Sequence, residues 1–355
     1  MRRDGDVDRT AAMVREDSQN EQNPAHRRRY QEEVGGHAFG RHEMRRRIVL
    51  GALVAISALS LAGAGAQGQP GGPKVTKLVT LSGGGNLYVI NGGGGNSVAL
   101  VTNSGIVLVD TKLDGWGRPI LDALNGVTDQ PVTTIINTHA HGDHTGSNHE
   151  FPSVVNIIAH ENTKVNMAKM DAFKGANAKF LPTKTFKDTM SLGSGSDQVD
   201  LYYFGAGHTN GDTIVVFPAA RAAYVGDLFT GRSAPIIDST NGGSGVAYPE
   251  TLAKAMATIK DVTAVIPGHD LPPLDPKRTT ARAREVLAWS SWGHLREFAD
   301  FTRDFLIAAQ EARKAGKSVE QAAAALKPKL AEKYKDYSME RATANVEAIY
   351  NELKN

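Results

Sequence analysis

The chain has 355 residues, of which 41% are hydrophobic and 22% charged, and this is long enough for one large core with a helical addition or for two domains. It contains no cysteine, which excludes disulfides, thiol nucleophiles, iron–sulfur clusters and every metal site with a thiolate ligand. The formal net charge is +2 and only 6% of residues are aromatic, so no nucleic-acid-binding surface is indicated. Residues 1–66 hold 11 Arg and 9 acidic side chains, which leaves residues 67–355 formally neutral.

The N-terminal part of the sequence resembles a leader. Residues 1–43 are polar and arginine-rich, and we expect them to form no packed core. Residues 44–66 combine a basic start, a short apolar run and small residues, which are the three parts of a bacterial export signal. This pattern predicts Met44 as the true start, cleavage after Ala64 or Ala66, and a periplasmic or secreted protein without a stable membrane anchor. An uncleaved anchor is the alternative, although the apolar run is short for a span.

Residues 67–74 are rich in Gly and Pro and predict a linker before a domain over residues 75–275. Short apolar, β-branched runs that end in turn residues predict the strands of this domain, at residues 86–90, 97–101, 105–110, 132–136, 154–158, 199–204, 213–217, 222–225 and 263–266. The glycine run within 91–96 predicts a hairpin loop, because no helix or Lys–Ser/Thr pair follows that would make it a phosphate cradle. Helices are expected at residues 119–124, 160–170 and 249–259.

Residues 276–355 predict a helical C-terminal region. Two sets of apolar residues have helical spacing, namely Leu295, Phe298, Thr302, Phe305 and Ala309, and then Ala342, Val346, Ile349 and Tyr350. Ser318 and Gln321 have the spacing of a capping box. We interpret the stripes as core contacts, so the pattern predicts an α/β or α+β body with a helical appendix.

Five of the eight histidines after the leader fall in three short segments, each where an apolar strand runs into a glycine-containing loop. A fourth such segment ends in a carboxylate. The side chains concerned are His139, His141, Asp143 and His144, then His208, Asp227 and His269. Three His and one Asp within six positions are typical of metal binding. Imidazole and carboxylate ligands suit Zn, Fe or Mn, and more than four of them fit two ions better than one tetrahedral site.

The run from His139 to His144 resembles the HxHxDH signature of the metallo-β-lactamase superfamily, and the three later ligands follow in that superfamily's order. The resemblance covers residues 75–275. It implies an α+β fold, a four-layer αβ/βα sandwich with the metal site along one sheet edge. It also implies the ligand sets, with His139, His141 and His208 on one cation, Asp143, His144 and His269 on the other, and Asp227 bridging both.

The same resemblance assigns the strand-end residue Asp110 to orienting a ligand or loop without touching metal, and a simple strand-end cap is the alternative. His149, His160 and His294 match no ligand motif and are expected to be surface or structural residues. Asp212 and Asp270 are expected to support turns.

Two divalent cations with Asp143, Asp227 and a hydroxide would leave about one positive charge in the site. Coordinated water has a pKa of about 7, and the resulting hydroxide would attack a carbonyl while a metal stabilises the oxyanion. Asp143 is the predicted catalytic carboxylate, which orients the nucleophile or carries its proton. The expected cofactors are two Zn ions, with Fe or Mn as alternatives, and the expected partner is a small-molecule substrate.

A bridging Asp227 is similar to the site of glyoxalase II-type thioesterases and lactonases, whereas β-lactamase subclasses have Cys or Ser there. The sequence thus predicts an exported hydrolase of a small ester, lactone, thioester or amide. Three alternatives stay open: a β-lactamase, a mononuclear iron enzyme of the persulfide dioxygenase kind, and a non-catalytic metal-binding accessory protein. Trp289, Trp292 and Tyr248 are candidates for the pocket wall, with core packing favoured for the two Trp.

Overall fold

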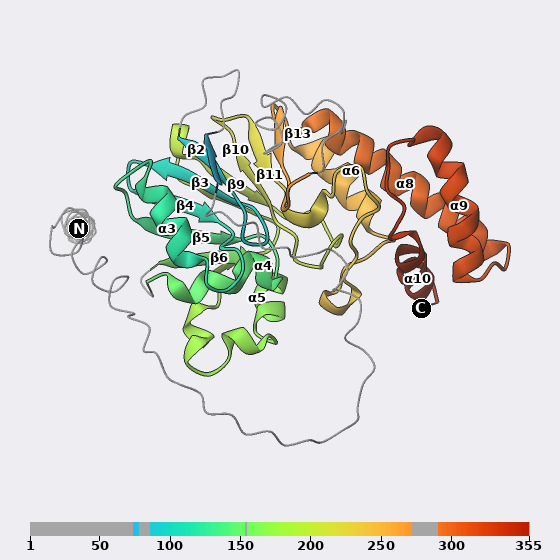
Figure 1. Ribbon diagram of the computed structural model, residues 1–355, viewed down its shortest axis with the longest axis horizontal. Helices are drawn as coiled ribbons and strands as arrows, with labels where there is room; N and C mark the ends of the chain where they lie inside the picture. The colour runs from blue at the N-terminus through green and yellow to red at the C-terminus, as the bar shows by residue number, and fades with distance from the viewer. Residues whose placement is uncertain (1–73, 78–85, 153–154, 272–289, 355) are drawn as a thin grey trace, which may run out of the picture. The chain divides into compact units, whose positions relative to one another are not determined.

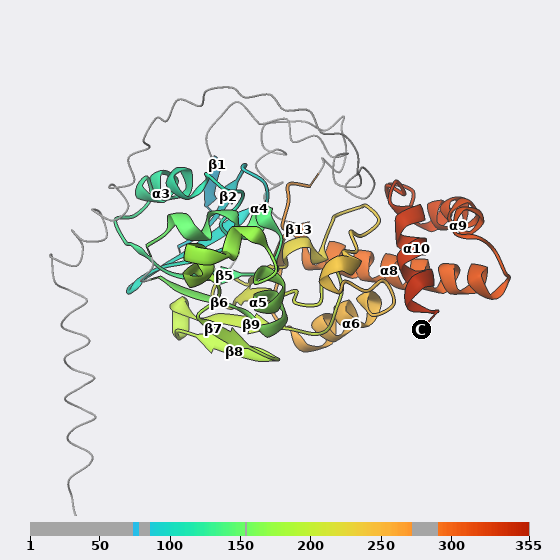
Figure 2. The ribbon, with the colours of Figure 1, turned by 90° about the horizontal axis from the view of Figure 1, so that it is seen from below.

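Two mixed β-sheets with helices outside them form the body of the protein in a computed structural model (Figures 1 and 2). The structure describes residues 74–77, 86–152, 155–271 and 290–354, all within the compact unit Gly68–Asn355. The predicted leader, nearly all of the predicted linker, and Trp289 lie outside the described residues.

The first sheet has seven strands in sequence order. Its first four strands pair antiparallel, and its fourth to seventh strands pair parallel. The strands are β1 (Lys74–Lys77), β2 (Leu87–Asn91), β3 (Ser97–Thr102), β4 (Gly105–Val109), β5 (Val132–Asn137), β6 (Asn156–His160) and β7 (Lys184–Phe186).

The second sheet has six strands in the order β13-β12-β11-β10-β9-β8. Strand β10 is antiparallel to both β9 and β11, and β11 is parallel to β12, so β9, β11 and β12 run in one direction. The strands are β8 (Thr189–Leu192), β9 (Val199–Tyr202), β10 (Ile214–Phe217), β11 (Ala222–Tyr224), β12 (Ala264–Ile266) and β13 (Ser290–Ser291).

Two apolar cores hold these layers together. The first lies between the sheets, where Leu87, Val98 and Ile136 of one sheet pack with Leu201 and Phe217 of the other. The second joins the outer face of the second sheet to the helices that follow it. The helices are α3 (Gly117–Asn125), α4 (Gly142–Thr145), α5 (Glu161–Met167), α6 (Tyr248–Thr258), α8 (Trp292–Lys314), α9 (Val319–Lys333) and α10 (Ala342–Glu352).

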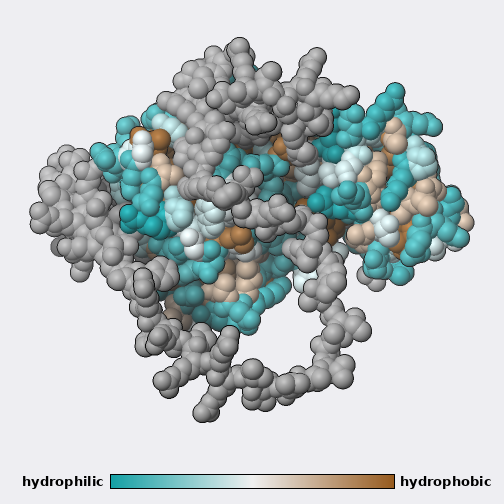
Figure 3. All heavy atoms as spheres, in the orientation of Figure 1, coloured by the Kyte–Doolittle hydropathy of each residue, from teal (hydrophilic) through white to brown (hydrophobic). Residues whose placement is uncertain are grey.

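The predicted α+β body with C-terminal helices is confirmed. Both predicted apolar stripes are buried in α8 and α10, and Ser318 and Gln321 form the predicted capping box at the start of α9. In Figure 3 the C-terminal helices show hydrophilic residues interspersed with apolar ones on the face drawn. Strands β7 and β8 escaped prediction because their segments are short and largely polar. None of the helices in the described ranges has the length and hydropathy that crossing a membrane requires.

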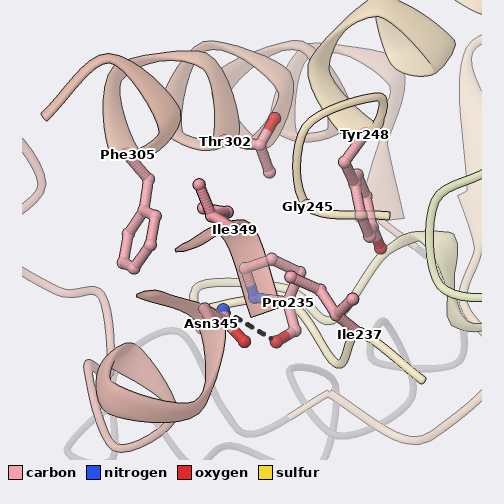
Figure 4. A pocket seen from close by; sticks show the side chains of 8 residues that line it. All are labelled: Pro235, Ile237, Gly245, Tyr248, Thr302, Phe305, Asn345 and Ile349. Carbon is pink, nitrogen blue, oxygen red and sulfur yellow. Dashed lines mark hydrogen bonds between the residues drawn. The ribbon is translucent and has the colours of Figure 1, made fainter. Parts of the chain in front are cut away.

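The C-terminal helices pack against the loop of residues 235–245, which leads to the candidate site. Phe305 of α8 and Ile349 of α10 line an apolar pocket against this loop, and Asn345 donates a hydrogen bond to the Pro235 carbonyl at 3.0 Å (Figure 4). Tyr248, on the opposite wall, is fully buried and donates to the backbone carbonyl of Asp227 at 3.3 Å. Tyr248 therefore has a core role, and the appendix and the site are linked through this packing.

Candidate metal centre

The strand directions bring the loops that carry the predicted metal ligands to neighbouring positions. Strands β4 and β5 are parallel, so Asp110 after β4 lies beside the loop after β5 that carries His139. Strands β9, β11 and β12 share one direction, so His208, Asp227 and His269 follow strand ends on one edge of the second sheet. All seven predicted ligands thereby converge in two neighbouring groups.

The first group is a triangle of imidazole nitrogens. His141 Nδ1 lies 3.2 Å from His139 Nε2 and 3.0 Å from His208 Nε2. A tetrahedral zinc site with Zn–N distances of about 2.0–2.1 Å has ligand-to-ligand edges of about 3.3–3.4 Å. The triangle therefore has nearly the size that a bound divalent cation requires.

The outer nitrogen of each ring in this triangle faces a hydrogen-bond acceptor. His208 Nδ1 donates to the Ile236 carbonyl at 2.9 Å, and His141 Nε2 faces the Asp238 carboxylate at 2.7 Å. His139 Nδ1 lies 3.0 Å from the Thr138 hydroxyl, whose proton is donated to Asp110 at 2.7 Å. In the neutral rings all three inner nitrogens consequently present lone pairs to one another. A proton can bridge one such pair, whereas a metal cation satisfies all three.

The second group consists of Asp143, His144 and His269. His269 Nε2 lies 3.4 Å from His144 Nε2 and 3.1 Å from Asp143 Oδ2. His144 is fully buried, and its outer nitrogen Nδ1 lies 2.7 Å from Asp110 Oδ2. Asp110 also accepts from the Thr138 backbone N–H at 2.8 Å, so it both orients the His144 ring and ties the ends of β4 and β5 together.

Asp227 stands between the two groups. Its Oδ2 lies 3.7 Å from His208 Nε2 and 3.4 Å from His269 Nε2, and its Oδ1 lies 3.3 Å from His144 Nε2. Among the described residues, no group makes a hydrogen bond to Asp227 Oδ1, although this atom is buried. A buried carboxylate oxygen without a hydrogen bond is costly unless a cation neutralises it. The donor set therefore fits a pair of divalent cations.

The imidazole donors differ in their electrostatics. Burial opposes charge on His141, but Asp238 and Asp227 outweigh it and raise its pKa. Burial lowers the pKa of His208 to about 4, and burial together with the neighbouring His144 and His141 holds the pKa of His139 well below its usual value. Burial opposes charge on His269 as well, but Asp227 and Asp143 outweigh it and raise its pKa to about 9. At neutral pH His139 and His208 are thus ready to coordinate, while a cation entering the second group must displace the proton of His269.

One side of the centre is open to solvent. The side chains of His269, Asp143 and His141 are 44%, 29% and 24% exposed, whereas His139, His144 and His208 are at most 1% exposed. A substrate can therefore approach from the side on which Asp143 and His269 lie.

The other residues singled out from the sequence have structural contacts. His160 accepts a hydrogen bond from the Asn162 N–H at the start of α5, His149 lies 3.0 Å from the Gly146 carbonyl, and His294 lies 2.8 Å from the Ser290 hydroxyl. Asp212 accepts from the backbone and side chain of Thr209, as expected of a turn residue. Trp292 packs against the C-terminal core.

Two residues near the centre escaped the sequence analysis. Asp238 begins a short 3₁₀ turn, Ser239–Asn241, and no motif marks it as the partner of His141. Lys112 is fully buried and has a positive φ of 65°, an unusual conformation for a lysine. A lysine three residues after a strand end is ordinarily assigned to the surface.

Asp238 supplies a first prediction. Burial would raise its pKa, but the bonds from His141 and Asn241 outweigh burial, so the pKa lies below its usual value and the carboxylate is ionised at neutral pH. We expect Asp238→Asn to weaken metal binding by roughly 10- to 100-fold, because the outer partner keeps the His141 ring oriented and basic. Competition with a chromophoric chelator measures this, with the exposed Asp336→Asn as the control. Unchanged affinity would show that the Asp238 contact is dispensable.

Lys112 supplies a prediction about pH. Burial lowers its pKa to about 7, against the raising influence of Asp270 and Asp110. Between pH 7 and 10.5 the unfolded chain therefore binds one more proton at this residue than the folded chain, so stability rises with pH in that window. We expect the free energy of unfolding of the metal-free protein to rise by about 1.4 kcal/mol per pH unit relative to Lys112→Met. Urea denaturation of both proteins across this range is the measurement, and parallel pH profiles would contradict it.

Curated proteins with similar sequences include enzymes of different named activities. The chain is 32% identical over 158 residues to the alpha subunit of 2,4-dinitroanisole O-demethylase from Nocardioides sp., a match that spans 43% of this chain and 47% of that subunit. It is 26% identical over 180 residues to metallo-beta-lactamase IND-1 from Chryseobacterium indologenes, spanning 49% of this chain and 71% of that protein. The chain thus spans only about half the length of the demethylase subunit.

Solved structures with similar folds include a sulfatase and a metallo-beta-lactamase. The sec-alkylsulfatase Pisa1 from Pseudomonas sp. superposes with a TM-score of 0.59 at 13% identity, over 75% of this chain and 49% of that one. A metallo-beta-lactamase from Pontibacter korlensis superposes with a TM-score of 0.50 at 18% identity, over 65% of this chain and 99% of that one. The family profile of the metallo-beta-lactamase superfamily matches residues 90–269, the region that contains every residue of the candidate centre. The chain belongs to the metallo-beta-lactamase superfamily.

Proposed function

We propose that this protein is an exported, dinuclear metal-dependent hydrolase that acts on a small ester, lactone, thioester or amide. The observation that carries the proposal is the buried Asp227 carboxylate, which lies between two groups of metal-type donors and has one oxygen without a hydrogen bond among the described residues. A mononuclear site would not account for the second group of metal-type donors, Asp143, His144 and His269. Family membership supports metal-dependent hydrolysis in general.

In this proposal His139, His141 and His208 hold one cation, Asp143, His144 and His269 hold the other, and Asp227 contacts both. When bound, such a cation pair supplies Lewis acidity and lowers the pKa of coordinated water to about 7. We propose zinc, with iron or manganese as alternatives, because all three accept imidazole and carboxylate ligands.

Side chains of the centre would supply proton transfer and would orient the ligands. Asp143 is the predicted catalytic carboxylate, since it is partly exposed, lies on the open side, and has a pKa that His269 and His144 hold below its usual value despite burial. As an ionised carboxylate it can accept the proton of the nucleophile and return it to the leaving group. Asp110 and Asp238 keep the His144 and His141 rings oriented from outside.

Export is proposed on the leader pattern at residues 44–66 alone. N-terminal sequencing of the mature protein tests it, and a mature start upstream of residue 60 would contradict it. The proposed compartment does not alter the chemistry of the centre.

A substrate panel tests the proposed activity. Purified protein with its metal quantified would be assayed with chromogenic esters, lactones, thioesters and anilides. A cephalosporin, 2,4-dinitroanisole and a secondary alkyl sulfate would represent the named activities of the similar proteins. We expect chelator-sensitive turnover of at least one carbonyl substrate. Chelator-insensitive turnover, or activity only with the ether or the sulfate, would contradict carbonyl hydrolysis.

A further inference from the structure

A buried lysine beside the centre has no part in the proposed chemistry. Lys112 Nζ donates two hydrogen bonds of 2.7 Å, to the carbonyls of Ile90 and Gly95. These carbonyls lie near the two ends of the glycine loop, residues 91–96, which runs from the last residue of β2 to the start of β3 and contains four consecutive glycines. Removing an amine from water is costly unless its hydrogen bonds are made inside, and the Ile90 and Gly95 carbonyls supply such bonds to the buried Nζ.

The glycine loop lies directly on two donors of the second group. The Gly95 N–H donates to the Asp143 carbonyl at 3.0 Å. A Cβ atom on Gly95 would overlap the His144 ring, and one on Gly94 would lie 2.9 Å from Asp143 Cβ. Because the φ of Gly95 is not positive, close approach to His144, and not backbone conformation, is what requires glycine at that position.

The other side of the same loop is fastened to the segment that carries the third donor of this group, His269. The Asn96 N–H donates to the Gly268 carbonyl at 2.6 Å, and the Asn96 side chain donates to the Pro267 carbonyl at 3.1 Å. Asn91 donates to Asp270 Oδ1 at 2.6 Å. The loop thus contacts Asp143 and His144 themselves, and the residues on either side of His269.

We propose that Lys112 is a positioning residue that fixes the glycine loop and, through it, the geometry of the second cation site. The proposal rests on the proposed dinuclear function. Lys112 acts at a distance from the first group, because the contacts of the loop run to Asp143, His144 and the segment around His269. Loss of the lysine should therefore weaken retention of one cation and leave the other in place.

Graded chelation of the metal-loaded full-length protein tests this proposal. Lys112→Met keeps the length of the side chain but removes its donors, and Gly95→Ala disturbs the same loop by contact with His144. We expect both variants to lose one Zn²⁺ at a chelator concentration roughly 10- to 100-fold lower than the wild type, while the other ion is released as before. Anomalous diffraction from crystals equilibrated at that concentration identifies the ion that is lost. The controls are Lys174→Met on the surface and Gly293→Ala in the first turn of α8.

The outcomes separate the two proposals. Selective loss of the ion between Asp143, His144 and His269 supports the role of Lys112. Equal weakening of both ions, or release identical to the wild type, would overturn it while leaving the dinuclear function intact. A wild-type protein that retains only one Zn²⁺ would overturn the dinuclear function itself. If Lys112→Met does not fold, Lys112→Gln, which keeps a polar side chain of shorter reach, takes its place in the same comparison.

Discussion

Replacement of Asp227 by alanine is expected to reduce kcat/KM by roughly a thousandfold or more and to leave at most one metal ion per chain. The reason is that this carboxylate lies within 3.7 Å of donors in both groups, so its removal affects both cations together. In the metal-loaded centre it would also be the buried negative charge that offsets the charge of both cations. Metal analysis and steady-state kinetics on the best substrate of the panel would measure both effects.

The control for this variant is another buried carboxylate that lies away from the centre. Asp200 on β9 is 9% exposed and accepts hydrogen bonds from Ser191 and Gln198. Asp200→Asn is expected to lower stability without changing the number of bound ions. A full complement of two ions in Asp227→Ala would refute the bridging position that we assign to Asp227.

Replacement of Asp143 by alanine is the second change with a large expected effect. We expect kcat to fall by roughly 10²- to 10⁴-fold, because a positioned acid–base group contributes about that much and Asp143 also completes the second group of donors. Its side chain is 29% exposed, so the variant should remain folded, as judged by an unchanged circular dichroism spectrum. The exposed Asp171→Ala serves as the control, since its carboxylate is 94% exposed and pairs only with Lys174 in the described part of the chain. Unchanged turnover in Asp143→Ala would exclude it as the catalytic carboxylate.

The sequence predicted much of the fold because its local signals agree with the tertiary structure. Strands such as Val132–Asn137 are short runs rich in β-branched residues that end in turn residues, and this length and composition favour a strand over a helix. The segment that forms β7 and β8 was missed, because these are short, largely polar edge strands whose strand conformation depends on pairing with one neighbour each.

The candidate ligands could be recognised from the sequence for a different reason, since they are clustered in the chain or follow strand ends. The residues that bond to the outer nitrogens of these rings could not all be recognised in this way. Asp238 lies 97 residues from His141 in the chain, on a loop against which residues of α8 and α10 pack. Lys112 is conspicuous only when its burial is known, because a charged residue after a strand is ordinarily exposed. Such contacts depend on tertiary packing, which no local pattern encodes.

Anomalous diffraction at the zinc edge, from crystals of the metal-loaded protein, tests the central claim most directly. Two peaks are predicted, one among His139, His141 and His208 and the other among Asp143, His144 and His269, with Asp227 in contact with both. A single peak, or peaks only at another cluster such as Asp114, His149 and Glu150, would contradict the proposed dinuclear centre.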